Sequence, residues 1–226
     1  PGTDWRALAA EETPALDPAR LTDDDRHMLA TCDGAVRNVT GHLEAFRLQD
    51  GTLAIYDVIW SQFCDWYLET VKNDLYGEDA ARRETVLRVL THIFSKGLRM
   101  LHPYMPFITE ELWHQMGYAA EDETILRAPF PRPLDAAAVA RFGLCDEVTA
   151  FVEARRELVT AGRALRADYG ISPTKQVRFI VHAVDAATAE RLAAAREPLL
   201  ALLKADAIDI AAAAETLPMP GSLVKL

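Results

Sequence analysis

Asp65 and Glu69 are the carboxylates whose spacing is nearest to a catalytic pattern, because residues four apart share one face of a helix. A carboxylate pair can act as general acid and general base. No partner base accompanies this pair, and Lys72 favours a solvated ion network instead. The six histidines lack metal-ligand spacing, and the sequence contains no glycine-rich phosphate loop or nucleophile elbow. We therefore expect neither catalytic residues nor a metal site in this chain.

Arginine clusters offer a second kind of chemistry, because guanidinium groups bind phosphate. Arg82, Arg83 and Arg88 belong to a stretch, residues 81–102, that holds five basic residues and one acid. A second basic stretch, residues 155–178, holds six basic residues and two acids. The chain as a whole carries a net charge of −10. This charge argues against a general nucleic-acid coat, so any phosphate contact should be local to a basic stretch.

The apolar pattern predicts the elements that must position these residues. Apolar residues recur at steps of three and four over three long segments, which predicts three antiparallel helices. Gln49-Asp50-Gly51 should separate the first two helices, and Pro103 should end the third. Pro106 then suits the first turn of a fourth helix that stops near Gly117. The segments are residues 22–46, 52–75 and 80–101. Leu53, Tyr56, Trp60, Phe63, Tyr67, Phe94, Leu101 and Trp113 are predicted to lie in the core.

The remaining chain predicts a smaller α/β part, so the fold class is mainly α, with a helical bundle followed by a small α/β subdomain. Three segments should form strands, and one helix should be dented or split at Pro198. Cys32, Cys64 and Cys145 fit buried free thiols in a reducing cytoplasm, and no apolar run could span a membrane. The predicted strands are residues 177–182, 207–211 and 223–226, and the helices are 148–170 and 186–203. The predicted ranges are an extended lead-in (1–21), the bundle (22–118), a surface linker (119–139) and the α/β subdomain (140–226).

Three ordered motifs give the chain a resemblance to a known family. They are FCDWYLETVK at 63–72, LHPYMPFITEELW at 101–113 and ILRAPFP at 125–131. In this order the motifs resemble the anticodon-binding region of valyl-tRNA synthetase, a class I aminoacyl-tRNA synthetase. The pair Asp25-Arg26 resembles the family's D-R pair at the start of the first bundle helix, and residues 170–175 resemble its G-I-x-P-x-K turn.

The resemblance implies a non-catalytic fragment of a valine–tRNA ligase of protein biosynthesis. It would follow the catalytic domain and end before the coiled-coil arm, and its parent protein would use ATP with Mg²⁺. The implied partner is tRNA(Val), bound by a cytoplasmic monomer without a membrane. Single-stranded bases are read by stacking and edge hydrogen bonds, with phosphate anchors beside them. The residues assigned to anticodon binding are Arg20, Arg82, Arg83, Leu87, Arg88 and Leu90.

Two alternatives remain open from the sequence. Isoleucyl- and leucyl-tRNA synthetases share the helical-bundle plan, so the amino acid could differ. A rival of another class is a protein-interaction module whose acidic face docks a basic partner. The acidic first 80 residues, with 16 acids against six basic residues, motivate that rival.

Overall fold

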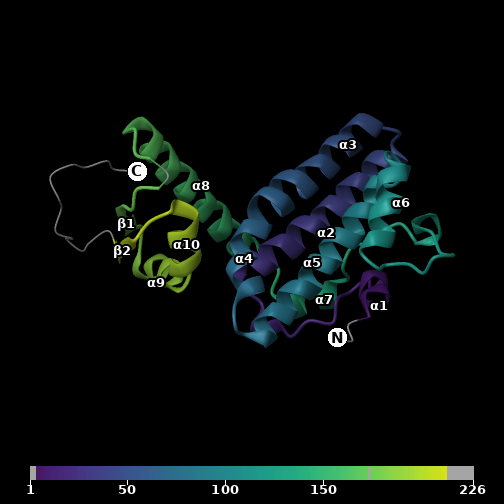
Figure 1. Cartoon of the computed structure of the whole chain (residues 1–226), viewed down its shortest axis with the longest axis horizontal. Helices are drawn as coiled ribbons and strands as arrows, with labels where there is room; N and C mark the ends of the chain where they lie inside the picture. Colours follow the sequence, from purple (N-terminus) through teal and green to yellow (C-terminus); the bar gives the residue numbers. More distant parts are fainter. Residues whose placement is uncertain (1–3, 173, 213–226) are drawn as a thin grey trace. The chain divides into compact units, whose positions relative to one another are not determined.

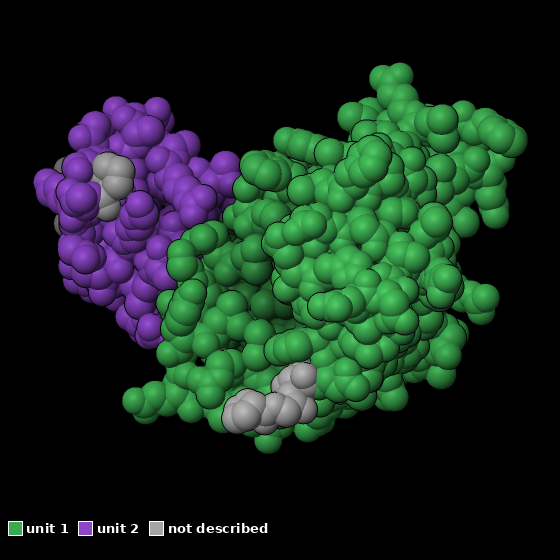
Figure 2. Space-filling model, turned by 45° about the vertical axis from the view of Figure 1, so that its right-hand side comes forward, with its two compact units in different colours: residues 1–150 green, residues 151–226 purple. Residues whose placement is uncertain are grey.

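The computed structural model describes residues 4–172 and 174–212 of the 226-residue chain. The chain divides into two units, residues 1–150 and residues 151–226 (Figure 2), which are described separately. Most described residues are helical, and the strands form one small sheet. This confirms the predicted fold class. The predicted domain ranges stay predictions, and the division between the units falls inside a long helix.

Unit 1 is a bundle of long helices packed around one apolar core (Figure 1). The third long helix packs against the first and against both halves of the second. Shorter helices and 3₁₀ turns precede and follow the bundle. The elements are α1 (Trp5–Ala10), η1 (Pro18–Arg20), α2 (Asp23–Glu44), α3 (Leu48–Tyr56), η2 (Asp57–Tyr67), α4 (Leu68–Tyr76), α5 (Ala80–Leu101), α6 (Pro106–Gln115), η3 (Ile125–Arg127), α7 (Ala136–Phe142) and the first residues of α8 (Asp146–Asp168).

The lead-in contains a helix where the sequence predicted extended chain. The carboxylate of Asp4 accepts a hydrogen bond from the backbone of Ala7 and so caps α1. Ala9 of this helix is buried in a satellite cluster with Leu98 and Trp113. The segment lacks a long apolar stripe because it is too short to show one, and tertiary contact stabilises it instead.

The break between the first two helices lies before the predicted one. α2 ends in a Schellman-type turn, in which the backbone N–H groups of Phe46 and Arg47 donate to the carbonyls of Leu43 and His42. Phe46 takes the left-handed position of this turn, with φ of 56°. Gly51 lies inside α3, where an added Cβ would lie 2.5 Å from the hydroxyl oxygen of Tyr104. A side chain at this position would require Tyr104 to shift, so the glycine serves close packing rather than a turn.

The second long helix contains a π-helical segment, η2, which changes the face that reaches the core. Ile55, Val58, Phe63 and Tyr67 are buried, whereas Trp60 is 54% exposed. Leu53 and Tyr56 are also exposed. The prediction that these three residues are core was wrong, because it assumed an α-helical period throughout. The predictions for Phe63 and Tyr67 are confirmed, and Phe94 and Leu101 are half-buried against the core. Trp113 is buried too, but in the satellite cluster with Ala9 and Leu98.

The corner after α5 follows the prediction. α5 ends at Leu101, and Pro106 occupies the first turn of α6. The Nδ1 atom of His102 lies 2.7 Å from the hydroxyl oxygen of Thr109, which links the two helices across the corner. Beyond α6, the segment predicted as a linker contributes Leu134 and Ala138 to the bundle core.

Unit 2 contains most of α8 and a two-stranded parallel sheet. The strands are β1 (Arg178–Ala183) and β2 (Ala207–Ala212), with Arg178 opposite Ala207. The helices α9 (Ala186–Ala194) and α10 (Arg196–Leu203) connect them. The helix is interrupted at Ala195, three residues before Pro198, as its missing N–H requires. The strand predicted at residues 223–226 lies outside the described residues.

The cysteines are free, but only Cys32 is fully buried. Burial raises the pKa of the Cys32 thiol to about 12. Cys64 is half-buried and Cys145 is exposed, so the expectation of three buried thiols was wrong. Cys145 precedes α8 instead of lying within its apolar stripe. No helix among the described residues is long and apolar enough to cross a membrane.

Candidate nucleic-acid interface

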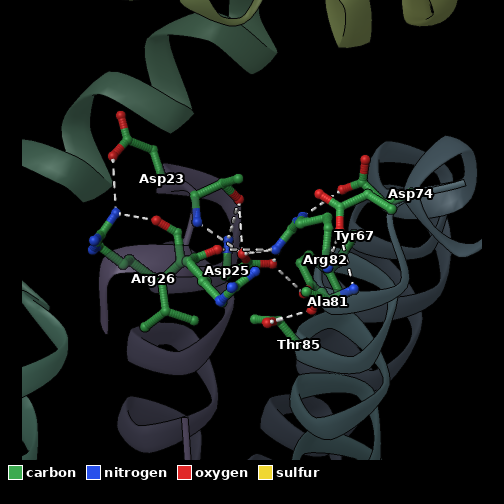
Figure 3. Close-up of polar contacts among 12 residues, drawn as sticks. Asp23, Asp25, Arg26, Tyr67, Asp74, Ala81, Arg82 and Thr85 are labelled. Atoms are coloured by element: carbon green, nitrogen blue, oxygen red, sulfur yellow. Dashed lines mark hydrogen bonds and ion pairs between the residues drawn. The ribbon is translucent and has the colours of Figure 1, made fainter. Parts of the chain in front are cut away.

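Asp25 is the centre of a buried polar network at one end of the bundle (Figure 3). It belongs to the capping box of α2, because its carboxylate accepts the backbone N–H of Thr22 at 2.8 Å and its own N–H donates to the Thr22 hydroxyl. The same carboxylate accepts the hydroxyl of Tyr67 at 2.6 Å. Burial and the Asp25 charge raise the pKa of Tyr67 well above its ordinary value, so the hydroxyl remains a donor.

Arg82 completes this network from the first turn of α5. Its guanidinium donates to Asp25 at 2.5 and 3.2 Å and to Asp74 of α4 at 2.8 Å. Burial alone would lower the pKa of Arg82, but the hydrogen bonds and charges of Asp25 and Asp74 outweigh burial and raise it. With its side chain only 15% exposed, Arg82 connects α2, α4 and α5. Its place favours a positioning role over direct phosphate contact.

Arg26, the neighbour of Asp25, fastens the lead-in to the bundle. Its guanidinium donates to the carbonyls of Pro18, Leu21 and Phe142 at 2.9, 2.6 and 3.0 Å. Arg82 adds a longer bond, 3.4 Å, to the carbonyl of Arg20. The Asp25-Arg26 pair thus fixes both the first helix and the segment that carries Arg20.

Arg20 and Arg88 lie together on the surface beside this network. Both line an open hollow between the lead-in and the first turns of α5. Two acids line it as well: Arg20 lies 3.6 Å from Asp17, and Arg88 lies 2.9 Å from Glu84. Surface pairs of this kind are weak and exchange readily for other anions. The structure therefore brings together two of the predicted site residues that lie far apart in sequence.

The other predicted site residues have different surroundings. Arg83 is half-buried, and its guanidinium donates to the carbonyl of Gly77 at 3.0 Å, which holds the turn before α5. Leu87 is half-buried. Leu90 packs against the bundle core, so it offers less surface to a base than predicted.

Two bases of the first basic stretch are internal. Lys96 and Arg99 are buried, and both meet Glu12 of the lead-in, at 3.7 and 2.6 Å. Lys96 also donates to the carbonyl of Arg132 at 2.7 Å, and Arg99 to that of Pro129. The stretch therefore presents surface charge only in the first turns of α5.

The second basic stretch is largely structural as well. Arg155 and Arg166 are buried. Arg166 donates to carbonyls of two segments of unit 2, including those of Ser172 before β1 and Lys204 after α10, at 2.8 and 3.1 Å. Arg178 pairs with Asp209 across the two strands. These contacts hold unit 2 together. Fewer basic side chains are therefore available to bind a polyanion than the number of basic residues in the sequence suggests.

Sequence reasoning missed the partnership of Asp25, Tyr67 and Arg82. Asp25 was recognised near a helix N-terminus, Tyr67 in an apolar stripe and Arg82 in a basic cluster. None of these patterns indicates that Arg82 contacts Asp25, which lies 57 residues away in sequence. The one available signal was the D-R pair itself. Among residues 4–172 and 174–212, no group of three or more metal-ligating side chains could hold a metal ion.

Comparison with known proteins gives a match to one family model and to several relatives. The family model described as the anticodon-binding domain of tRNA ligase matches residues 25–181. The chain is 35% identical to the valine–tRNA ligase of Geobacter sulfurreducens over 77% of its length, and 34% identical to that of Thermosynechococcus vestitus over 72%. The corresponding enzyme of Chromobacterium violaceum is 33% identical over 74%. The matched regions make up 19%, 17% and 17% of these relatives, so the chain spans less than a fifth of their length.

Proposed function

Because the chain belongs to the anticodon-binding domain family of tRNA ligases, we propose that unit 1 binds the anticodon arm of tRNA(Val). The relatives named above are valine–tRNA ligases, which favours valine over isoleucine or leucine. In the complete protein, valine would be attached to this tRNA in the cytoplasm with ATP and Mg²⁺. The chain's own part in this reaction is recognition.

The observation that carries the proposed site is the position of Arg20 and Arg88 around one hollow. Protein contacts to phosphate fix the register of a bound nucleic acid, and guanidinium groups at the surface can make them. Arg83 does not line this hollow, and its guanidinium donates to the carbonyl of Gly77, so we leave it out of the proposed contact. Arg82 instead positions the lead-in, because its guanidinium is occupied by Asp25 and Asp74. Leu87 would offer an apolar edge to a base.

The opposite end of the bundle suits phosphate less well. It carries the carboxylates of Glu110 and Glu111 on α6 and of Glu44 at the end of α2. Carboxylates repel phosphate, whereas the hollow offers the guanidinium groups of Arg20 and Arg88 beside its two acids, so we place the contact at the hollow.

The test reverses charge at residues that are not needed for folding. Binding of tRNA(Val) and of isoleucine and leucine anticodon stem-loops is measured at about 50 and 200 mM salt for the intact chain and for Arg20→Glu/Arg88→Glu. We expect the valine stem-loop to compete best. The double variant should bind at least ~10-fold more weakly, with a flatter salt dependence.

The matched control is Arg47→Glu/Arg127→Glu, which changes net charge equally at two exposed positions away from the hollow. It should keep its affinity within about twofold. Equal losses in both double variants would reject the site, and better competition by another stem-loop would reject the valine assignment.

A further inference from the structure

An apolar stripe on the second long helix is exposed, although the helix lies along the side of the bundle (Figure 1). Leu53, Tyr56 and Trp60 form it, and each is more than half exposed. Their spacing of three and four residues puts the three side chains on one face. The rings of Tyr56 and Trp60 stack with centroids 6.3 Å apart and an angle of 15° between planes.

The π-helical segment η2 is the reason that this stripe faces outward. In a continuous α-helix, Tyr56, Trp60, Phe63 and Tyr67 would share one face. The wider π-turns let Phe63 and Tyr67 enter the core while Trp60 stays outside. π-Helical turns are rare in proteins, and those that occur are often found at functional sites. The backbone conformation of η2 therefore places the aromatic pair on the surface.

Carboxylates surround the aromatic pair. Residues 48–76 contain five acids and one base, Lys72. Asp57 lies beside Tyr56, and Asp65 lies one π-turn beyond Trp60, so both flank the stripe. Within the described part of the chain, Asp57 and Asp65 form no ion pair, whereas Glu69 is paired with Lys72. The rim of the stripe thus carries unneutralised negative charge.

We propose that Leu53, Tyr56 and Trp60 form a docking surface for a basic amphipathic helix of a protein partner. Tyr and Trp are the residues that most often dominate binding energy at protein interfaces, and a mutually stacked pair loses little freedom on binding. The apolar face of the partner helix covers the stripe. Its arginine or lysine side chains pair with Asp57 and Asp65 and can lie over the aromatic rings. RNA is disfavoured here because the same carboxylates repel phosphate.

The surface is separate from the proposed tRNA site. Arg20 and Arg88 belong to the lead-in and α5, whereas the stripe belongs to α3 and η2. The two proposals can therefore fail independently.

The experiment titrates the intact chain with a synthetic amphipathic helix of about 18 residues, with a leucine face and arginine flanks. Isothermal titration calorimetry is run at about 0.15 M salt, which screens weak charge attraction. We expect Trp60→Ala and Tyr56→Ala each to weaken binding at least ~10-fold. Asp57→Asn/Asp65→Asn should also weaken it and reduce its dependence on salt.

Three comparisons decide the result. Phe107→Ala, a substitution of an exposed aromatic on α6, should change peptide affinity less than about twofold, and so should Arg20→Glu/Arg88→Glu. A peptide of the same composition scrambled to remove the leucine face should bind at least ~10-fold more weakly. The proposal is overturned by absence of binding, by equal binding of both peptides, or by unchanged affinity in Trp60→Ala. Displacement of the peptide by a single-stranded RNA oligomer that Trp60→Ala no longer binds would also overturn it and assign the stripe to RNA.

Discussion

Asp25 shows how one buried carboxylate can serve several elements at once. It caps α2, accepts the Tyr67 hydroxyl from η2 and pairs with Arg82 from α5. A carboxylate without exposed surface is tolerated only when its oxygens are satisfied in this way. Through the guanidinium of Arg82, the same group reaches Asp74 and the carbonyl of Arg20. The position of the proposed tRNA contact therefore depends on a residue that would not touch tRNA.

Replacing Asp25 by alanine should reduce the free energy of unfolding by about 3–5 kcal/mol, because the buried Arg82 charge loses its main partner. Urea unfolding followed by tryptophan fluorescence measures this in unit 1, since Trp5, Trp60, Trp66 and Trp113 all lie in it. Asp65→Ala removes an exposed carboxylate and should cost less than about 0.5 kcal/mol. Similar losses in the two variants would show that the network contributes little.

At the scale of elements, sequence patterns predicted most helices but not their registers. The periods of α2 and α5 and the corner at Pro103 and Pro106 were readable, because apolar spacing and proline geometry act locally. The π-helical segment could not be predicted, since its apolar residues recur at the same spacing as in an α-helix and carry no separate local signature. The turn at Phe46 was missed for a similar reason, because a glycine normally occupies that position.

The candidate site was predictable in part. The basic cluster at the start of α5 was visible as sequence, and its nearness to Arg20 was expected from the family resemblance. Burial was not readable from the sequence, because Lys96 and Arg99 pair with Glu12 and Arg82 pairs with Asp25, and these carboxylates lie at least 57 residues away. Only Asp74, the second partner of Arg82, is near it in sequence. Long-range pairs of this kind depend on the tertiary fold, which a count of charges does not contain.

The register of the π-helical segment predicts that two neighbouring aromatic residues, Trp60 and Phe63, contribute unequally to stability. Phe63→Ala should reduce the free energy of unfolding by about 3–5 kcal/mol, because Phe63 is buried and stacks on Phe94. Trp60→Ala should cost about 1 kcal/mol or less, because Trp60 is exposed and loses mainly its contact with Tyr56. Both are measured by urea unfolding with circular dichroism at 222 nm, a wavelength that reports helix content. A larger cost for Trp60→Ala would mean that an α-helical register holds.

At the scale of the whole unit, the lead-in and the segment after α6 are fastened to the bundle through one acid. Glu12 accepts from Arg99 at 2.6 Å and from the backbone N–H of Arg132 at 3.0 Å, and it lies 3.7 Å from Lys96. Burial would raise the pKa of Glu12, but the Arg132 N–H and the Arg99 guanidinium outweigh burial and lower it. Three segments that are distant in sequence therefore meet at this carboxylate.

His92 is buried near Lys96 and Arg99, and it makes the stability of this region depend on pH. Burial, with the nearby charges of Lys96 and Arg99, lowers its pKa well below the ordinary value of 6.5, although a backbone hydrogen bond at Glu11 acts in the opposite direction. The folded protein thus keeps His92 neutral where the unfolded chain would already bind a proton.

Unit 1 should consequently lose stability on acidification in two stages. Where the unfolded state binds more protons, the free energy of unfolding falls as pH falls. His92 acts first, as pH falls through the unfolded-state value of 6.5. Glu12 acts below its unfolded-state value of 4.5, until its lowered folded pKa is reached. Urea unfolding followed by tryptophan fluorescence at several pH values measures both stages. His92→Gln should flatten the dependence between about pH 7 and 5, and Glu12→Gln should flatten it only below about pH 4.5. Because each variant also changes stability at neutral pH, slopes are compared instead of absolute values. An unchanged slope in His92→Gln would show that another group binds the proton.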